Sequence, residues 1–222
     1  DHLKYERGYS EHTLDSYRRD LDKFFAYIDK NEILMDAVTK DDIRNWLSEE
    51  LDSGVGKRSC QRRMSALRGF YEFAKEKGYT KTNPFSFVSA PKKPIRYPKA
   101  LTIEQVDALF SANAARTDEL KVRDQAILEL LYASGMRASE LCSVTYPQID
   151  YRNRMIRVYG KGKKERLVPF GLTAEKAMQD YYTRLRPLLQ AKHKGGELVT
   201  AFFLTDRGNK LSVRDLEYIL TE

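Results

Sequence analysis

The chain has 222 residues, of which 41% are apolar and 32% are charged, and its formal net charge is +7 at pH 7. This balance is typical of a globular protein with one or two domains and excludes a disordered one. Apolar runs such as 130–133 fall far short of the roughly 20 residues that cross a bilayer, so we expect no membrane span. Cys60 and Cys142 have no metal-ligand spacing and cannot form a disulfide framework, which favours a reducing compartment, the cytoplasm.

The positive charge is unevenly distributed along the sequence. Residues 1–56 hold 8 basic and 14 acidic side chains, whereas residues 57–99 hold 12 basic and 2 acidic ones. A charge run of this kind is usually a solvated helix face. Here it continues into a Lys/Pro segment, and a second basic cluster follows at 152–166 with seven basic residues and one acidic residue. We therefore expect a polyanion as the partner.

Apolar side chains at intervals of three and four residues predict helices in the first part of the chain. The first is an amphipathic helix of about 18 residues that begins near Ser10. The second begins with a pattern like a capping box, formed by Thr39 and Asp42. The third covers about 57–77 and ends at Gly78. Aromatic residues recur on the apolar sides of these helices, and we expect them in the core rather than as a platform for stacking bases.

The third helix also has a basic side, which can enter a groove of a nucleic acid or lie along its phosphates. The residues concerned are Lys57, Arg58, Arg62, Arg63 and Arg68. Asn83-Pro84 ends this unit, and 89–99 contain three prolines, four basic residues and no periodicity. We interpret 89–99 as an extended linker whose Lys92 and Lys93 can lie against a duplex backbone.

Beyond the linker the pattern changes to mixed α and β. A box at 102–105 begins one helix, and a buried helix ends at Gly135, just before Arg137. This arginine lies on a short connection, where a side chain can project into a cleft. Residues 155–159 and 165–169 are predicted strands joined by a turn rich in glycine and lysine, which is not a Walker A loop. On its own, Arg137 is more typical of a structural ion-pair partner than of a catalytic residue. The turn on its own is more typical of a solvated hairpin than of a functional loop.

Two stretches in this order resemble the tyrosine recombinase (phage integrase) family, specifically its Xer-type chromosome-dimer resolvases. They are Tyr-Ala-Ser-Gly-Met-Arg-Ala-Ser-Glu-Leu at 132–141 and Ile-Arg-Val-Tyr-Gly-Lys-Gly-Lys-Lys-Glu-Arg-Leu-Val-Pro at 156–169. The pattern Ser-x-x-Thr-x-x-x-Tyr-x-x-Asp-Leu-x-x-Phe at 10–24 and the Asn83-Pro84 turn are similar to that family too. The resemblance covers essentially the whole chain.

The resemblance implies a mostly α fold with a small antiparallel β-sheet, in two domains that close on DNA as a clamp. Residues 1–88 would form a helical, SAM-like core-binding domain, 89–99 the basic linker, and 100–222 the first portion of a mixed α/β catalytic domain. The implied partners are double-stranded DNA with a recombination site and, at full length, a tetrameric synaptic complex with the protein itself or a paralogous recombinase. No cofactor and no metal are implied.

The resemblance also assigns residues to the chemistry. Arg137 matches the family's first catalytic arginine, Lys161 matches the catalytic lysine of the β-hairpin, and Glu140 lies where an acidic residue commonly flanks the active site. A planar, permanently charged guanidinium suits the nonbridging oxygens, over which the transition state of phosphoryl transfer spreads its charge. A lysine on a hairpin can protonate the leaving 5′ oxygen if its pKa is lowered. Lys163 and Lys164 of the same turn are expected to contact DNA.

Other parts of the family pattern are absent from the 222 residues. Family members continue with a His-x-x-Arg box and a nucleophilic Tyr that forms a 3′-phosphotyrosyl bond, whereas the histidines here are His2, His12 and His193. Tyr218 falls in an expected helix, begun by Ser212, that normally precedes this box, so we do not assign it as the nucleophile. We expect an incomplete recombinase that binds DNA but does not cleave it.

Two alternatives remain open from the sequence. The first is a naturally short DNA-binding protein that occupies recombination sites without cutting, which the continuation of the reading frame would test. The second is an RNA-binding helical protein, although no pattern of an RNA-recognition module is present.

Overall fold

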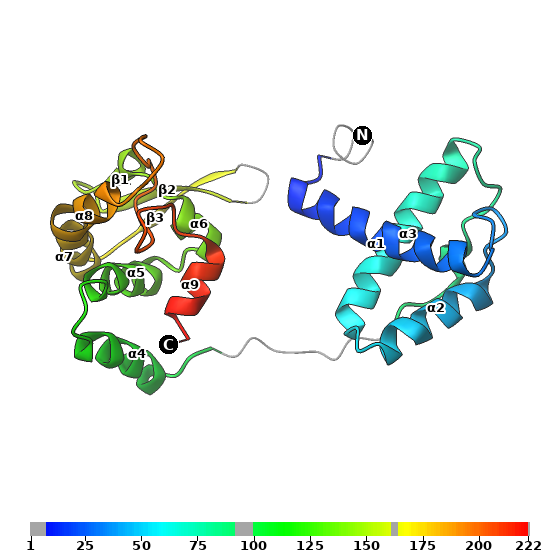
Figure 1. Ribbon diagram of the computed structural model, residues 1–222, viewed down its shortest axis with the longest axis horizontal. Helices are drawn as coiled ribbons and strands as arrows, with labels where there is room; N and C mark the ends of the chain where they lie inside the picture. The colour runs from blue at the N-terminus through cyan, green and yellow to red at the C-terminus, as the bar shows by residue number, and fades with distance from the viewer. Residues whose placement is uncertain (1–7, 92–99, 161–163, 222) are drawn as a thin grey trace. The chain divides into compact units, whose positions relative to one another are not determined.

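The computed structural model of the chain describes residues 8–91, 100–160 and 164–221. The chain divides into two compact units, residues 1–98 (unit 1) and 99–222 (unit 2), and each has its own hydrophobic core (Figure 1). Within the described ranges, no helix is both long enough and apolar enough to cross a membrane.

Unit 1 is helical. It consists of α1 (Glu11–Lys30), α2 (Lys40–Asp52), α3 (Lys57–Glu76) and the 3-10 turn η2 (Pro84–Phe87). The side chain of Ser10 caps α1, and Thr39 and Asp42 form a reciprocal capping box at the start of α2. The three predicted helices are confirmed, and the starts of α1 and α2 could be read from the sequence because they are local hydrogen bonds that need no tertiary contact.

Aromatic rings fill the centre of unit 1. The ring of Phe24 lies 5.0 Å from that of Trp46 and 5.2 Å from that of Phe85, and Tyr71 also lies 5.2 Å from Phe85. All four side chains are fully buried. The two pairs that Phe24 forms are edge to face, and such packing adds about 0.5–1.5 kcal/mol per pair to the burial of apolar area. The aromatic residues thus form the core of the unit, as expected.

Unit 2 contains an antiparallel sheet with the strand order β1 (Ile149–Asp150), β2 (Met155–Tyr159) and β3 (Glu165–Pro169). The register of the hairpin runs from Met155 opposite Pro169 to Tyr159 opposite Glu165. Ile156, Val158 and Val168 are buried on one face of this hairpin. Strand bounds and pairing agree with the prediction, which followed the alternation of apolar and polar residues.

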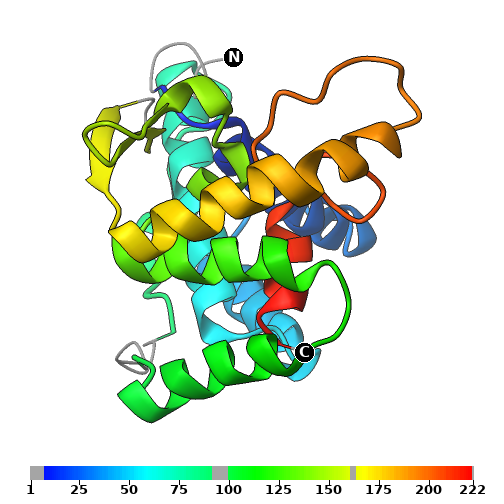
Figure 2. The ribbon, with the colours of Figure 1, turned by 90° about the vertical axis from the view of Figure 1, so that its left-hand side faces the viewer.

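The rest of unit 2 is mainly helical. Its elements are α4 (Ile103–Ala115), α5 (Lys121–Ser134), α6 (Ala138–Ser143), the 3-10 turn η3 (Tyr146–Gln148), α7 (Leu172–Asp180), the π-helical turn η5 (Tyr181–Leu185), α8 (Arg186–Ala191) and α9 (Val213–Ile219). Helix α5 packs against α7, and the two lie side by side in Figures 1 and 2. Helix α5 also contacts β3 and η5, and its residues Ala126, Ile127 and Leu130 are buried in the core of unit 2. The predicted fold class, mostly α with a small antiparallel sheet, is confirmed.

Candidate active site

The loop between α5 and α6 positions Arg137. Gly135 ends α5 in the left-handed region with φ +57°, a conformation that suits glycine and turns the chain sharply out of the helix. Arg137 then has extended backbone angles, φ −75° and ψ 151°, and is the N-cap of α6. This local geometry leaves its side chain 65% exposed. The predicted placement of this arginine on a short connection between a glycine stop and a new helix is therefore observed.

Glu140 lies beneath this arginine and is almost completely buried, with 3% of its surface exposed. Its Oε2 accepts the backbone N–H of Arg137 at 2.7 Å, which closes the capping box of α6. Its Oε1 accepts Nη1 of Arg137, also at 2.7 Å. The same carboxylate thus caps the helix and holds the guanidinium of its N-cap residue.

Arg166 on β3 is the second guanidinium at this carboxylate. It donates from Nη1 to Oε1 of Glu140 at 2.5 Å and from Nη2 to Oε2 at 2.8 Å. Because Arg166 lies opposite Val158 in the register, it is on the inward face of the hairpin, two residues before the buried Val168. The sequence analysis included Arg166 only in the basic cluster at 152–166 and gave it no role of its own.

The electrostatics of the cluster of Arg137, Glu140 and Arg166 follow from these contacts. Burial tends to raise the pKa of the Glu140 carboxyl, but the hydrogen bonds from Arg166 and from the backbone and side chain of Arg137 lower it to about 2. Glu140 is therefore ionised at neutral pH. Two guanidiniums against one carboxylate leave a net positive charge, and the exposed Arg137 can offer its remaining donors to an anionic oxygen.

The hairpin next to this cluster carries the predicted lysines. The backbone N–H of Gly160 donates to the carbonyl of Lys164 at 2.8 Å and closes the turn, and Lys164 is exposed. Lys161 and Lys163 lie outside the described residues. An added Cβ at Gly160 would lie 3.6 Å from Nη1 of Arg137, so the start of this turn adjoins the cluster.

The basic residues of α3 differ in what they can contact. Lys57 and Arg58 are exposed, and neither has an ion-pair partner within the described part of the chain. Arg62 is 42% exposed on its side chain but pairs with Asp20, and it also donates to the carbonyl of Ser16 at 3.2 Å. Lys57 and Arg58 are therefore accessible to a phosphate and Arg62 partly so, and their contact with DNA stays a prediction.

One of the predicted DNA contacts on α3 needs correction. Arg63 is 6% exposed and forms buried ion pairs with Glu50 and Asp20, so it is not available to a phosphate and has a structural role. Arg68 donates from Nε to the carbonyl of Phe85 and from Nη2 to that of Val88, both at 3.1 Å, which ties α3 to η2 and the residue after it. Arg68 is nevertheless exposed, so its contact with DNA stays a prediction. Lys92 and Lys93 lie outside the described residues.

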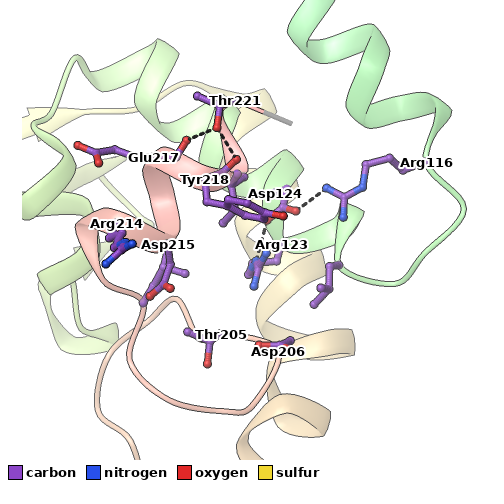
Figure 3. Close-up of a pocket in the computed structure, with 13 residues that line it drawn as sticks. Arg116, Arg123, Asp124, Thr205, Asp206, Arg214, Asp215, Glu217, Tyr218 and Thr221 are labelled. Atoms are coloured by element: carbon purple, nitrogen blue, oxygen red, sulfur yellow. Dashed lines mark hydrogen bonds and ion pairs between the residues drawn. The ribbon is translucent and has the colours of Figure 1, made fainter.

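A cavity of about 640 Å³ opens elsewhere in unit 2 (Figure 3). Three of its charged side chains pair with one another: Asp124, which is 2% exposed, accepts from Arg116 at 2.6 Å and from Arg123 at 2.7 Å. Tyr218, 63% exposed, lines this cavity and points toward it. None of the three residues of the Arg137, Glu140 and Arg166 cluster is among its lining residues. We therefore do not assign this cavity to the active site.

Comparison with solved structures identifies proteins with the same fold over nearly the whole chain. In fold, the chain is similar to integrases in complex with DNA: the Tn1549 transposon integrase in complex with transposon right end DNA superposes with a TM-score of 0.75 at 17% identity, covering 98% of this chain and 74% of that one. A lambda integrase tetramer bound to a Holliday junction gives 0.69 at 18%, covering 98% and 61%.

Other relatives have a higher sequence identity to this chain than these two integrases. The profile of the phage integrase N-terminal SAM-like domain matches residues 1–78, and that of the phage integrase family matches residues 99–222. Tyrosine recombinase XerC of Thermodesulfovibrio yellowstonii is 37% identical over 221 residues, which are 99% of this chain and 71% of the relative; that of Bacillus subtilis is 35% identical, over 100% and 72%. The chain belongs to the phage integrase, or tyrosine recombinase, family, whose members are site-specific DNA recombinases.

Proposed function

We propose that this chain supplies the DNA-binding and arginine-bearing parts of a recombinase that cleaves and rejoins DNA through a 3′-phosphotyrosyl intermediate. The observation that carries the proposal is the exposed Arg137 held on a buried, ionised Glu140 at the base of a basic hairpin. The narrower role, resolution of chromosome dimers at cell division, is supported by the Xer-type motifs and by the likeness to XerC. Such work on a bacterial chromosome takes place in the cytoplasm.

The proposed chemistry gives each residue a separate task. The tyrosine oxygen attacks the phosphorus, a 3′-phosphotyrosyl bond forms, and the bond to the 5′ oxygen breaks. Arg137 binds a nonbridging oxygen, where negative charge develops. Lys161 gives its proton to the departing 5′ oxygen, so that a 5′ hydroxyl is released. The 222 residues contain no His-x-x-Arg box, so we propose that on their own they bind DNA without forming this bond.

We propose that duplex DNA is contacted by Lys57, Arg58 and Arg62 of α3 and by Lys164 with the neighbouring lysines of the hairpin turn. These side chains supply positive charge from both units, and the described ones are exposed at the surface. The lambda integrase tetramer on a Holliday junction, which has the same fold, supports a tetrameric synaptic complex at full length. The partner copies would be the protein itself or a paralogous recombinase.

The salt dependence of binding tests the DNA-binding part of this proposal with the 222-residue chain. If about six phosphates are neutralised, log K plotted against log salt should have a slope near −5. Charge reversal of Lys57 and Arg58 should flatten this slope, whereas reversal of Lys192 and Lys194 should leave it unchanged; these control lysines are also exposed. A slope near zero for the unaltered chain would reject DNA binding. Equal losses from both pairs would reject the assignment to α3.

A further inference from the structure

One carboxylate joins the β2–β3 hairpin to the loop that carries Arg137. Arg166 contacts both oxygens of Glu140, at 2.5 and 2.8 Å, and Arg137 shares Oε1 at 2.7 Å. A bidentate guanidinium–carboxylate contact fixes the two planar groups relative to each other more strictly than a single hydrogen bond does. Arg166 therefore restricts the carboxylate, and the carboxylate restricts Arg137.

The exposure of the three side chains separates their roles. The side chain of Glu140 is 2% exposed, that of Arg166 is 38% exposed and that of Arg137 is 65% exposed. Arg166 lies on the inward face of β3 and commits both terminal nitrogens to Glu140, which leaves it poorly placed to bind a second anion. Arg137 commits Nη1 and remains the accessible guanidinium.

The two guanidiniums also converge where the hairpin turn begins. A Cβ added at Gly160, directly after β2, would lie 3.5 Å from Nη1 of Arg166 and 3.6 Å from Nη1 of Arg137. The contact between Arg166 and Glu140 thus fastens the base of the hairpin to the Arg137 loop. The distance between the Arg137 guanidinium and the start of the turn depends on that contact.

We propose that Arg166 is a positioning residue: through Glu140 it fixes the orientation of the Arg137 guanidinium and holds the hairpin base against the Arg137 loop. The inference rests on the proposed function, because it takes Arg137 to be the group that meets the phosphate. Displacement of a reacting group by about 1 Å can cost as much as 10²-fold in rate. Arg166 therefore affects the reaction without touching the DNA.

The first arm of the test measures the contact in the 222-residue chain and needs no DNA. Carbon-13 NMR titration follows the Glu140 carboxyl, and hydrogen exchange follows the Arg137 guanidinium protons. Arg166→Gln should raise the pKa of Glu140 from about 2 toward its ordinary range and speed the exchange at Arg137. The control, Arg157→Gln, removes a hairpin arginine that pairs with Glu165 and should change neither quantity. An unchanged Glu140 pKa in Arg166→Gln would overturn the inference.

The second arm measures DNA cleavage by the full-length protein under single-turnover conditions. Arg166→Gln should slow adduct formation by roughly 10- to 100-fold at unchanged DNA affinity. When a methyl group replaces the nonbridging oxygen, the charge that Arg137 neutralises is gone, so the losses caused by Arg137→Ala and by Arg166→Gln should shrink together. The double variant should be no slower than Arg137→Ala alone.

The outcomes of this arm are separable from those of the proposed function. Equal slowing by Arg166→Gln on both substrates, or additive losses in the double variant, would overturn positioning and indicate a structural or direct role. Should Arg166→Gln fail to fold, Arg166→Lys takes its place, because it keeps the charge and loses the bidentate contact. If the unaltered full-length protein forms no adduct, the proposed function fails, while the NMR arm still decides whether Arg166 orients Arg137.

Discussion

Replacement of Glu140 by glutamine keeps the shape of the side chain and removes the charge that two guanidiniums share. Burial tends to raise the pKa of this carboxyl, but hydrogen bonds from Arg166 and Arg137 lower it from 4.5 to about 2. One pKa unit corresponds to about 1.4 kcal/mol, so the ionised carboxylate stabilises unit 2 by about 3 kcal/mol at neutral pH. Because both arginines are partly exposed, solvent screening reduces the expected loss in Glu140→Gln to about 2 kcal/mol.

The pH dependence of this loss has a definite sign. A carboxyl whose pKa is lower in the folded state stabilises the fold above its unfolded pKa, which is about 4.3 for glutamate. That stabilisation disappears as the pH falls through the folded pKa of about 2. The difference in free energy of unfolding between the unaltered chain and Glu140→Gln should therefore be constant near neutral pH. It should decrease toward zero as the pH falls from about 5 to about 2.

Calorimetry and circular dichroism measure this difference, and Trp46 provides an internal control. It is the only tryptophan, it lies buried in unit 1, and its fluorescence reports the unfolding of that unit. Glu140→Gln should leave the Trp46 transition in place. Glu165→Gln, which removes an exposed partner of Arg157, should cost less than about 0.5 kcal/mol. Equal losses in the two variants, or a difference that persists at low pH, would refute the reasoning.

Three further predictions follow from the contacts. Arg63→Met should cost unit 1 about 3 kcal/mol in urea unfolding, because it leaves Glu50 without its buried partner; a loss near zero would contradict this. Gly208→Ala should destabilise unit 2 by more than about 1 kcal/mol, since φ is +78° and the new Cβ would collide with the carbonyl of Leu189; unchanged stability would show that the loop relaxes. In the full-length protein, Lys161→Ala should slow cleavage by roughly 10² to 10⁴. Sulfur at the 5′ bridging position should restore the rate, and an unrestored rate would exclude a general acid there.

The sequence was most informative where structure depends on neighbouring residues. The box at Thr39 and the stop at Gly135 are formed by groups within a few residues of each other, and the hairpin follows from alternation alone. The basic side of α3 could not be resolved in this way. Adjacent helical residues point about 100° apart, so helical periodicity alone does not decide whether Arg62 and Arg63 both face outward. Only the packing of α1 and α2 shows that Arg63 is buried against Glu50 and Asp20, whereas Arg62 stays 42% exposed.

Arg166 illustrates a signal that was present in the sequence but was not used. In the strand 165–169, alternation places Arg166 on the same side as Val168, which is the buried face. An arginine on a buried face requires an acidic or carbonyl partner. The identity of that partner depends on how α6 packs against the sheet, because Glu140 is separated from Arg166 by 26 residues.

The formation of a covalent adduct on a nicked duplex tests most directly whether Arg137 is the guanidinium of a DNA-cleaving site. In the full-length protein, Arg137→Ala should slow the adduct by about 10² or more, because it removes a donor from the transition state, while DNA affinity stays close to that of the unaltered protein. The matched control is Arg154→Ala, which removes an equal charge that pairs with Glu175 at 2.7 Å, and it should form the adduct at the unaltered rate. An unaltered rate in Arg137→Ala, or equal slowing in both variants, would contradict the assignment.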